Sequence, residues 1–333
     1  MTSIALVGCA HIHMPKFVDM LLGRADVPVT AVWDHDRGRA ERTAAWLPTS
    51  NVREVDDIWA DDEIGAVVIC SETVRHRDLV MAAVEAGKHL FVEKPLAAAA
   101  NESREMAEAI AASGLLFSTG FFLRSLAAHR FLRDEIAAGR MGKVTRIHVS
   151  VAHAGALDGW FDDEWRWMVD PSLAGFGALG DCGSHGVDLI LWLLGDDADL
   201  VHATARTGSV TGRYGSIDEY GHAELGFAAG THASVWASWT DLASPVQLVV
   251  SGTEAHATII DGRLTYRQGG IGDRSERHPD LPDELPHAFE SFLEAVAGGS
   301  SGHLVTAAEA ARCASVIESL YLAAQRSDTR IGR

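Results

Sequence analysis

A lysine and an aspartate–histidine pair are the residues of this chain whose types and spacing best suit proton transfer. Lys94 comes directly after a short apolar run, and Asp181 and His185 stand four residues apart in a later apolar segment. Residues at i and i+4 share one face of a helix. An imidazole is a good general base near neutral pH, and an ammonium group stabilises negative charge that develops on an alcohol oxygen. We therefore expect these three residues to be catalytic, with either Lys94 or His185 as the proton acceptor. The alternatives are a solvated lysine at a strand end and a histidine satisfied within a core.

The elements that must position Lys94 alternate between strand and helix over the first 122 residues. Short, wholly apolar runs predict strands that are covered on both faces. Repeated strand–helix units with short loops predict a parallel, doubly wound sheet, that is, an α/β fold. The expected strands are 4–7, 29–33, 66–70, 90–92 and 115–119, and the expected helices are 15–23, 37–47, 75–86 and 101–113.

The pattern changes after residue 122, where most runs alternate with a period of two residues. This alternation predicts a large, mostly antiparallel open sheet with one buried face, within an α+β domain. We therefore expect two domains, residues 1–122 and residues 123–333. The expected strands are 144–153, 201–207, 219–227, 232–240, 246–251, 255–260 and 263–268; the expected helices are 125–138, 180–194, 286–297 and 307–326; and residues 269–286 are expected to form a loop.

The first strand–helix turn suits a dinucleotide, although it departs from the usual pattern. A dinucleotide-binding turn carries G-x-G-x-x-G, in which each glycine has a steric role. Here Gly8 is kept, whereas Ala10 and His13 replace the second and third glycines. The turn still leads into a helix N-terminus, which favours phosphate. Asp34 ends the second strand, where an acidic residue accepts hydrogen bonds from the adenosine ribose, so NAD is expected over NADP.

His11 and His13 also permit a different interpretation. Two histidines two residues apart after a first strand, with His76 after the third strand, resemble the metal ligands of an amidohydrolase barrel. The second half of the chain alternates as antiparallel sheet, whereas a barrel requires further strand–helix units. We therefore expect no metal, and expect both histidines to line the cofactor cleft.

Several motifs, in this order, resemble those of the Gfo/Idh/MocA family of NAD(P)-dependent oxidoreductases. The resemblance runs almost from end to end. It is carried by Ala66-Val67-Val68-Ile69 with His76, Glu85-Ala86-Gly87-Lys88-His89 leading to Glu93-Lys94-Pro95, Phe122-Leu123-Arg124, Ala138-Gly139-Arg140-Met141-Gly142, Gly175-x-Gly177 before Asp181-x-Gly183-x-His185-x-x-Asp188, and Gly252-Thr253-Glu254.

The resemblance implies an N-terminal Rossmann domain, a C-terminal antiparallel sheet, and Lys94, Asp181 and His185 as catalytic residues. The altered glycine motif is a departure that bears on cofactor affinity and phosphate geometry. The expected cofactor-binding residues are Gly8, Ala10, His11, Ile12, Asp34, Arg37, Ser71, His76, Glu93 and Lys94.

The loop 157–168 predicts a carbohydrate or polyol as the substrate. It carries four aromatic residues among acidic ones, and aromatic rings stack on the C–H faces of sugars. An ordinary packing loop explains the same composition equally well. Arg124 suits a carboxylate or phosphate of the substrate, or a surface salt bridge. The expected substrate-binding residues are Lys94, Arg124, Trp165, Asp181 and His185.

These features predict an NAD(P)-dependent dehydrogenase that acts on a secondary alcohol of a sugar, cyclitol or sugar derivative. A protein that senses or binds cofactor without turnover remains an alternative. A hydrolase or lyase that uses tightly bound NAD transiently is another.

Composition restricts the partners. The formal net charge of −18 disfavours nucleic acid and anionic membranes. Four scattered cysteines favour reduced thiols in the cytoplasm. We expect no signal peptide, because the first residues carry no basic region and no cleavage site, and we expect no membrane span, because no apolar run reaches roughly 18 residues. Trp236, Trp239 and Val235 share one alternating run, so we expect the C-terminal sheet to be buried in a homodimer or homotetramer.

Overall fold

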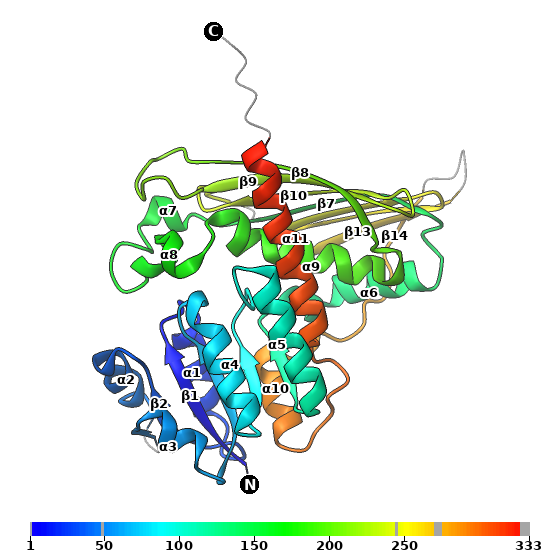
Figure 1. Ribbon diagram of the computed structural model, residues 1–333. Helices are drawn as coiled ribbons and strands as arrows, with labels where there is room; N and C mark the ends of the chain where they lie inside the picture. The colour runs from blue at the N-terminus through cyan, green and yellow to red at the C-terminus, as the bar shows by residue number, and fades with distance from the viewer. Residues whose placement is uncertain (1, 48–49, 244–245, 270–274, 327–333) are drawn as a thin grey trace. The chain divides into compact units, whose positions relative to one another are not determined.

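The chain forms two compact units, each assembled from separate stretches of sequence. The computed structural model describes residues 2–47, 50–243, 246–269 and 275–326 (Figure 1). Unit 1 comprises Met1–Phe121, Phe161–Gly175 and Pro286–Ser315, and unit 2 comprises Phe122–Trp160, Phe176–Leu285 and Val316–Arg333. Two stretches beyond residue 122 thus belong with the N-terminal segment, and the division into domains at that residue stays a prediction.

Unit 1 contains a six-stranded parallel sheet, which confirms the predicted doubly wound α/β architecture. The strands follow the order β3-β2-β1-β4-β5-β6, and every neighbouring pair is parallel. The sequence analysis missed β3 and the short helix α3 that follows it. The strands are β1 (Ser3–Cys9), β2 (Val29–Trp33), β3 (Asn51–Val52), β4 (Ile64–Cys70), β5 (His89–Val92) and β6 (Phe117–Thr119).

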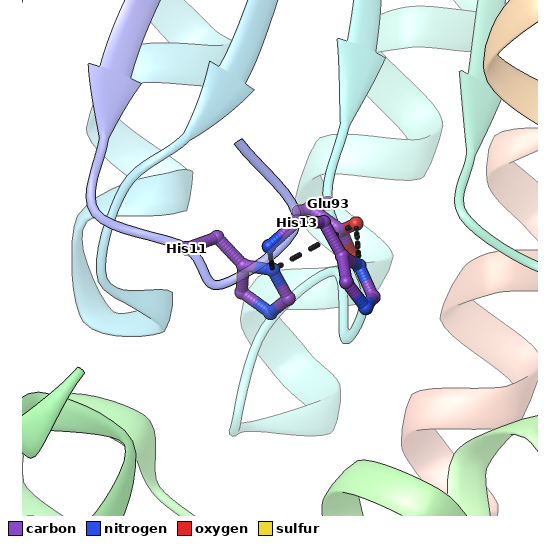
Figure 2. A group of neighbouring side chains, drawn as sticks. All are labelled: His11, His13 and Glu93. Carbon is purple, nitrogen blue, oxygen red and sulfur yellow. Dashed lines mark hydrogen bonds and ion pairs between the residues drawn. The ribbon is translucent and has the colours of Figure 1, made fainter. Parts of the chain in front are cut away.

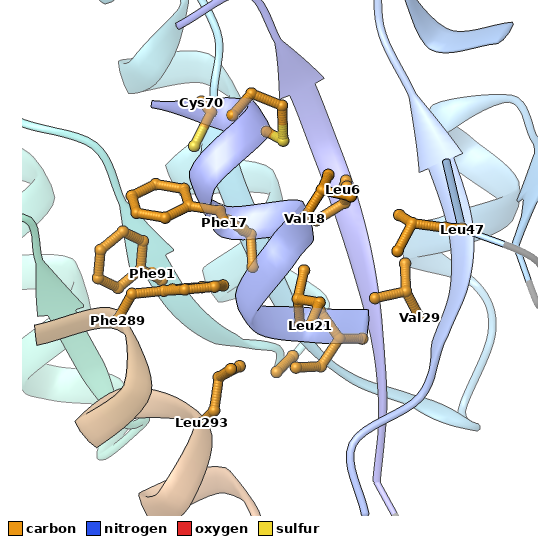
Figure 3. Packing of buried hydrophobic residues seen from close by; sticks show 14 of the residues in the cluster. Leu6, Phe17, Val18, Leu21, Val29, Leu47, Cys70, Phe91, Phe289 and Leu293 are labelled. Carbon is orange, nitrogen blue, oxygen red and sulfur yellow. The ribbon is translucent and has the colours of Figure 1, made fainter. Parts of the chain in front are cut away.

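The helices of unit 1 pack their apolar faces on this sheet. Phe17 of α1 stacks closely on Phe289 of α10, with ring centroids 4.4 Å apart, and Phe289 also meets Phe91 of β5 at 4.9 Å (Figure 3). A segment from the end of the chain therefore completes the core around β1 and β5. The helices are α1 (Met14–Leu22), α2 (Arg37–Ala44), α3 (Val55–Trp59), η1 (Thr73–Arg75), α4 (His76–Glu85), α5 (Ala100–Ser113), η3 (Arg166–Val169), α8 (Pro171–Ala174), α10 (Ala288–Val296) and the first part of α11 (Ala307–Arg326).

Unit 2 contains an eight-stranded sheet in the order β14-β13-β12-β11-β7-β10-β9-β8. Among the described strands β10 and β7 pair in parallel and the other neighbours are antiparallel, which confirms a mostly antiparallel sheet. The strands are β7 (Val144–Ala152), β8 (Leu200–Gly208), β9 (Tyr220–Phe227), β10 (His232–Ser238), β11 (Val246–Gly252), β12 (Ala255–Ile260), β13 (Arg263–Gln268) and β14 (Glu276–Arg277).

The expected loop 269–286 contains β14, while residues 270–274 lie outside the described part of the chain. The remaining helical segments of unit 2 are η2 (Phe122–Ser125), α6 (Ala127–Ala137), α7 (Gly155–Asp158), α9 (Ala178–Leu194) and η4 (Gly195–Asp197).

Helix α9 lies directly on one face of the unit 2 sheet, alongside α6 (Figure 1). Gly186 permits this approach, because a Cβ there would stand 3.0 Å from a methyl group of Val235 and 3.3 Å from one of Val149. Val235 and Trp239 are fully buried. Val235 and Trp239 are thus covered within the chain and not by a partner subunit, as the sequence analysis expected for all three residues; of the three, only Trp236, which is half-buried, points to the opposite face of the sheet.

No helix in the described ranges has both the length and the apolar character needed to cross a bilayer.

Candidate functional site

The turn after β1 is shaped by a close approach to the end of β4. Gly8 has φ +87°, and a Cβ at this position would lie 2.5 Å from the Cβ of Ser71. Both the backbone angle and the space exclude a side chain. The retained glycine of the dinucleotide motif therefore brings the β1 and β4 ends together, which places Ser71 beside the predicted cofactor turn.

Most backbone N–H groups of this turn are engaged within the protein. Those of Ala10 and His11 both donate to the carbonyl of Cys70, at 2.9 and 3.0 Å. The N–H of His13 donates to Nδ1 of His11 at 3.3 Å, and the N–H of Met14 donates to the His11 carbonyl at 2.9 Å. The turn is thus bound to the end of β4 and to His11, with few of its N–H groups left for phosphate.

Asp34, the predicted ribose ligand, is held in a buried charge cluster. Its Oδ2 accepts the N–H of Cys9 at 2.6 Å and the Nε–H of Arg39 at 2.8 Å. Its Oδ1 accepts the N–H of Asp36 at 2.8 Å and a second bond from Arg39 at 2.7 Å. Two carboxylate oxygens offer about four acceptor sites in all. A ribose hydroxyl would have to replace one of these donors, so the ribose role of Asp34 stays a prediction.

Glu72 joins this cluster and also pairs with a second arginine, Arg75, at 3.3 Å. Arg39 also donates to Glu72 at 2.8 Å. Burial opposes its charge, but Asp34 and Glu72 outweigh this and raise the pKa of Arg39. Arg37, the arginine predicted to contact the cofactor, instead faces solvent and pairs with Glu41 at 3.0 Å. The charges of Arg39 and Arg75 are thus offset by Asp34 and Glu72, so these four groups leave no net positive charge for a 2′-phosphate.

Glu93 is the centre of a second cluster, formed with the two histidines of the turn (Figure 2). The Nδ1–H of His13 donates to Glu93 Oε1 at 2.6 Å, and Nδ1 of His11 lies 3.9 Å from the same oxygen. Glu93 is fully buried. Burial raises the pKa of this carboxyl, but the neighbouring histidines dominate and hold its pKa well below the usual range.

Lys94 follows at the carboxyl edge of the sheet and is 3% exposed. Its backbone N–H donates to Glu93 Oε2 at 2.7 Å, and its peptide bond to Pro95 is cis. His76 binds the segment that follows, with Nδ1 3.2 Å from the carbonyls of Pro95 and Leu96 and Nε2 3.2 Å from that of Ser71. His76 therefore braces the lysine turn, and it does not join His11 and His13 as the metal interpretation supposed.

In unit 2, Asp181 lies in the first turn of α9. Its Oδ2 accepts the indole N–H of Trp239 at 2.9 Å and lies 3.8 Å from Nε2 of His153. The ring of Trp160 stacks on His153 at 4.7 Å, with an interplanar angle of 18°. Trp160 is 41% exposed. An ionisable pair and an accessible aromatic face therefore lie together at the start of the helix.

The start of α9 is fastened by a tyrosine from α11. The hydroxyl of Tyr321 accepts the N–H groups of Gly177 and Gly180 at 3.0 and 3.1 Å and donates to Asp218 at 2.9 Å. Asp218 in turn accepts the N–H of Leu179 at 2.9 Å. Burial raises the pKa of Asp218 and is only partly offset by these bonds. The N–H groups that begin the helix are thus satisfied by two side chains distant in sequence.

The remaining polar residues of α9 lie one and two turns further along. His185 is 6% exposed and packs edge-on against Phe122, with centroids 5.0 Å apart. Asp188 forms a two-pronged ion pair with Arg124, at 2.9 and 2.6 Å. Arg124 also lies 5.9 Å over the ring of Trp192. The arginine considered for substrate binding is therefore committed to a largely buried ion pair.

The aromatic loop divides between the two units. Trp165 is half-buried in unit 1, whereas Asp181, His185 and Arg124 belong to unit 2. Trp167 is buried in unit 1, where its indole N–H donates to the Ala10 carbonyl at 2.8 Å. This loop is thus partly a packing element, as one of the two interpretations held.

The sequence analysis left several residues out of its site. Arg39, His153, Trp239 and Tyr321 all contact predicted site residues or the helix that carries them. The position of Arg39 five residues after Asp34, at the start of a helix, was the available signal. The others come from strands and helices distant in sequence, and nothing in their local pattern marks them.

Comparison with known proteins agrees with this architecture. Residues 2–121 match the model of the oxidoreductase family with an NAD-binding Rossmann fold, and residues 129–258 match the GFO/IDH/MocA C-terminal domain. The chain is 29% identical to 1,5-anhydro-D-fructose reductase of Ensifer adhaerens, over 79% of each chain. It is 27% identical to scyllo-inositol 2-dehydrogenase (NAD(+)) of Bacillus subtilis, over 89% of this chain and 86% of the relative.

Among solved structures, it superposes on an inositol dehydrogenase homologue of Azotobacter vinelandii complexed with NAD+. The TM-score is 0.80, with 20% identity over 98% of this chain and 96% of the other. Two family models in the expected order, each covering one part of the architecture, lead to one conclusion: the chain belongs to the Gfo/Idh/MocA family of NAD-binding oxidoreductases.

Proposed function

We propose that this protein transfers a hydride between NAD and a secondary alcohol of a sugar, cyclitol or sugar derivative. The observation that carries the proposal is the position of Lys94 in a chain of this family. It follows β5 at the carboxyl edge of the parallel sheet, in a segment braced by Glu93 and His76. Ligands of open α/β sheets bind at this edge.

The residues of unit 1 fit NAD better than NADP. Arg39 is already paired with Asp34 and Glu72, and these two carboxylates disfavour a 2′-phosphate beside them. Because Gly8 has no side chain, the ends of β1 and β4 approach closely, as the tight turn of a dinucleotide site requires. Bound NAD supplies the hydride acceptor at C4 of its nicotinamide.

The substrate class rests on the relatives and on unit 2. The two relatives compared above are named for an anhydro sugar and an inositol. Asp181 offers a carboxylate for a hydroxyl group, and Trp160 offers an accessible ring for a sugar face. Trp165 and Arg124 are weaker candidates, since Arg124 is already paired with Asp188.

We assign three roles to the catalytic residues. The Lys94 ammonium binds the reacting hydroxyl and stabilises the alkoxide as it forms. The His185 imidazole takes the hydroxyl proton, and Asp181 orients the substrate. In the oxidation direction the C–H bond breaks with its electron pair leaving as hydride, the O–H proton goes to the base, and a ketone remains.

The test is the reduction of NAD by the purified protein with a panel of polyols and sugars, at saturating cofactor. We expect NADH with at least one member of the panel. Lys94→Met should abolish turnover while NAD affinity changes little, and the exposed Lys143 of unit 2 supplies the control Lys143→Met, which should keep both. Cofactor binding without turnover for any member would favour a sensor, and bound NAD that is never consumed during release of product would favour a hydrolase or lyase.

We also infer a homo-oligomer that buries the outer face of the unit 2 sheet. That face carries the half-buried Trp236, on which Tyr220 stacks at 5.6 Å. Light scattering separates a dimer from a tetramer. A cytoplasmic location is consistent with the free thiols of Cys9, Cys70, Cys182 and Cys313.

A further inference from the structure

We propose that His11, His13 and Glu93 form a binding site for a divalent transition-metal ion, for which Zn²⁺ is the natural probe. All three residues belong to unit 1, and their ligand atoms lie within 4.8 Å of one another (Figure 2). Two imidazoles and one carboxylate are the ligand set of many sites that keep a coordination position open.

The arrangement of lone pairs points to a cation. His11 Nδ1 accepts the backbone N–H of His13, so this nitrogen carries a lone pair. The same nitrogen lies 3.9 Å from Glu93 Oε1, which is too far for a direct hydrogen bond. His11 is 4% exposed and Glu93 is fully buried, so little water screens this contact. A cation bound here would supply positive charge to the buried carboxylate, and the single lone pair of His11 Nδ1 would turn from the His13 N–H to the ion.

The distances fit an ion with small movements. At metal–ligand distances of about 2.1 Å, tetrahedral geometry separates neighbouring ligand atoms by roughly 3.4 Å. The His11–Glu93 separation of 3.9 Å would close slightly, and the His13–Glu93 separation of 2.6 Å would open once the shared proton leaves. These two changes are of about 0.5 and 0.8 Å. The ligand atoms of the two histidines, which lie within 4.8 Å of each other, would also draw together in the turn before α1.

The surroundings are those of a supported metal site. Glu93 Oε2 is held by the backbone N–H of Lys94 at 2.7 Å, which leaves Oε1 oriented toward the histidines. The ring of Trp167 lies 5.9 Å from that of His11 and shields one side. The His13 side chain is 38% exposed and supplies a path to solvent. The site requires no glycine-rich phosphate turn, which agrees with the replacement of the third motif glycine by His13.

The experiment is a calorimetric titration of the tag-free, chelator-treated full chain with Zn²⁺, followed by Co²⁺ with visible absorption. It does not depend on NAD or on turnover. We expect one ion per chain, the release of about one proton as the His13 proton is displaced, and a rise in melting temperature with free metal. His13→Asn and Glu93→Gln should each weaken binding at least tenfold.

The matched control is His153→Asn. His153, Asp181 and Cys182 form the other described cluster with metal-ligand types within 4.8 Å. This variant should bind Zn²⁺ as the parent does. The proposal is overturned if the parent chain binds no ion at submillimolar Zn²⁺, or if binding is lost in His153→Asn and kept in His13→Asn. Because circular dichroism of each variant is compared with the parent, loss of fold is not mistaken for loss of a ligand.

Discussion

Replacing Tyr321 by phenylalanine tests whether one hydroxyl group fixes the start of helix α9. The substitution removes only the oxygen that accepts the N–H groups of Gly177 and Gly180 and donates to Asp218. Both glycines and Asp218 are buried, so water cannot readily replace the bonds that the hydroxyl makes.

The magnitude follows from counting these bonds. Leaving a buried donor or acceptor unsatisfied costs about 1–3 kcal/mol. The Gly177 N–H loses its acceptor, whereas the Gly180 N–H still donates to the Gly177 carbonyl at 3.1 Å and Asp218 keeps the bond from Leu179. We therefore expect Tyr321→Phe to lower the free energy of unfolding by about 2 kcal/mol, or the melting temperature by roughly 4 °C at about 2 °C per kcal/mol.

The assay combines thermal unfolding with steady-state kinetics and NAD binding. The turnover number should fall, because the loosened segment carries Asp181. NAD affinity should not change, because the predicted cofactor residues lie in unit 1. Tyr220→Phe is the control, since the described structure shows no hydrogen bond from the Tyr220 hydroxyl; it should stay within about 0.5 kcal/mol of the parent. Equal melting temperatures for Tyr321→Phe and Tyr220→Phe would refute the role assigned to the hydroxyl.

Three further predictions concern other parts of the two units. Arg124→Met and Asp188→Leu should each destabilise the protein by about 3–5 kcal/mol, and the double variant by less than their sum, as measured by urea unfolding; unchanged stability with only a raised KM would identify Arg124 as a substrate ligand instead. Gly8→Ala should destabilise more than Gly212→Ala, because both have positive φ (+87° and +66°) but only Gly8 meets a neighbour; equal losses would contradict the close approach to Ser71. The pKa of Glu93 is depressed in the folded protein, so this carboxylate contributes its full stability above the ordinary glutamate pKa of about 4.3 and loses it progressively as the pH falls below that value. The free energy of unfolding should therefore decline less steeply between about pH 5 and 3 in Glu93→Gln than in the parent. Parallel curves would show that the buried carboxylate is not the titrating group.

The fold was largely predictable, since it rests on local patterns. A wholly apolar run indicates a strand buried on both faces, and an alternating run indicates a strand buried on one face. These two patterns located most strands to within a few residues. The exceptions are short. β3 and β14 have two residues each and α3 has five, which is too little for a periodic signal, and the two strands are placed by pairing with β2 and β13.

The site was predictable only where a motif is continuous in the sequence. Lys94 stands at a strand end, as Glu93-Lys94-Pro95 after an apolar run indicated. The partners of the site residues were not predictable, because Arg124 finds Asp188 across 64 positions and Tyr321 finds Asp218 across 103. Such pairings form only in the folded chain, and a single sequence does not show which distant residues come into contact. Asp34 and Arg39 are only five positions apart in the sequence. Whether Asp34 binds a ribose hydroxyl or the Arg39 guanidinium nevertheless depends on distances in the folded protein, which the order of residues does not give.

The insertion of α10 into the core of unit 1 limits how this protein can be cut. Phe289 and Phe292 are completely buried against the ring of Phe91, although almost two hundred residues separate them along the chain. A fragment that ends near residue 122 would expose that apolar surface to water and would tend to aggregate. Exchange of the nucleotide-binding part between relatives therefore calls for a graft that carries the 286–315 stretch as well, or for a circular permutation that joins it to the N-terminal segment.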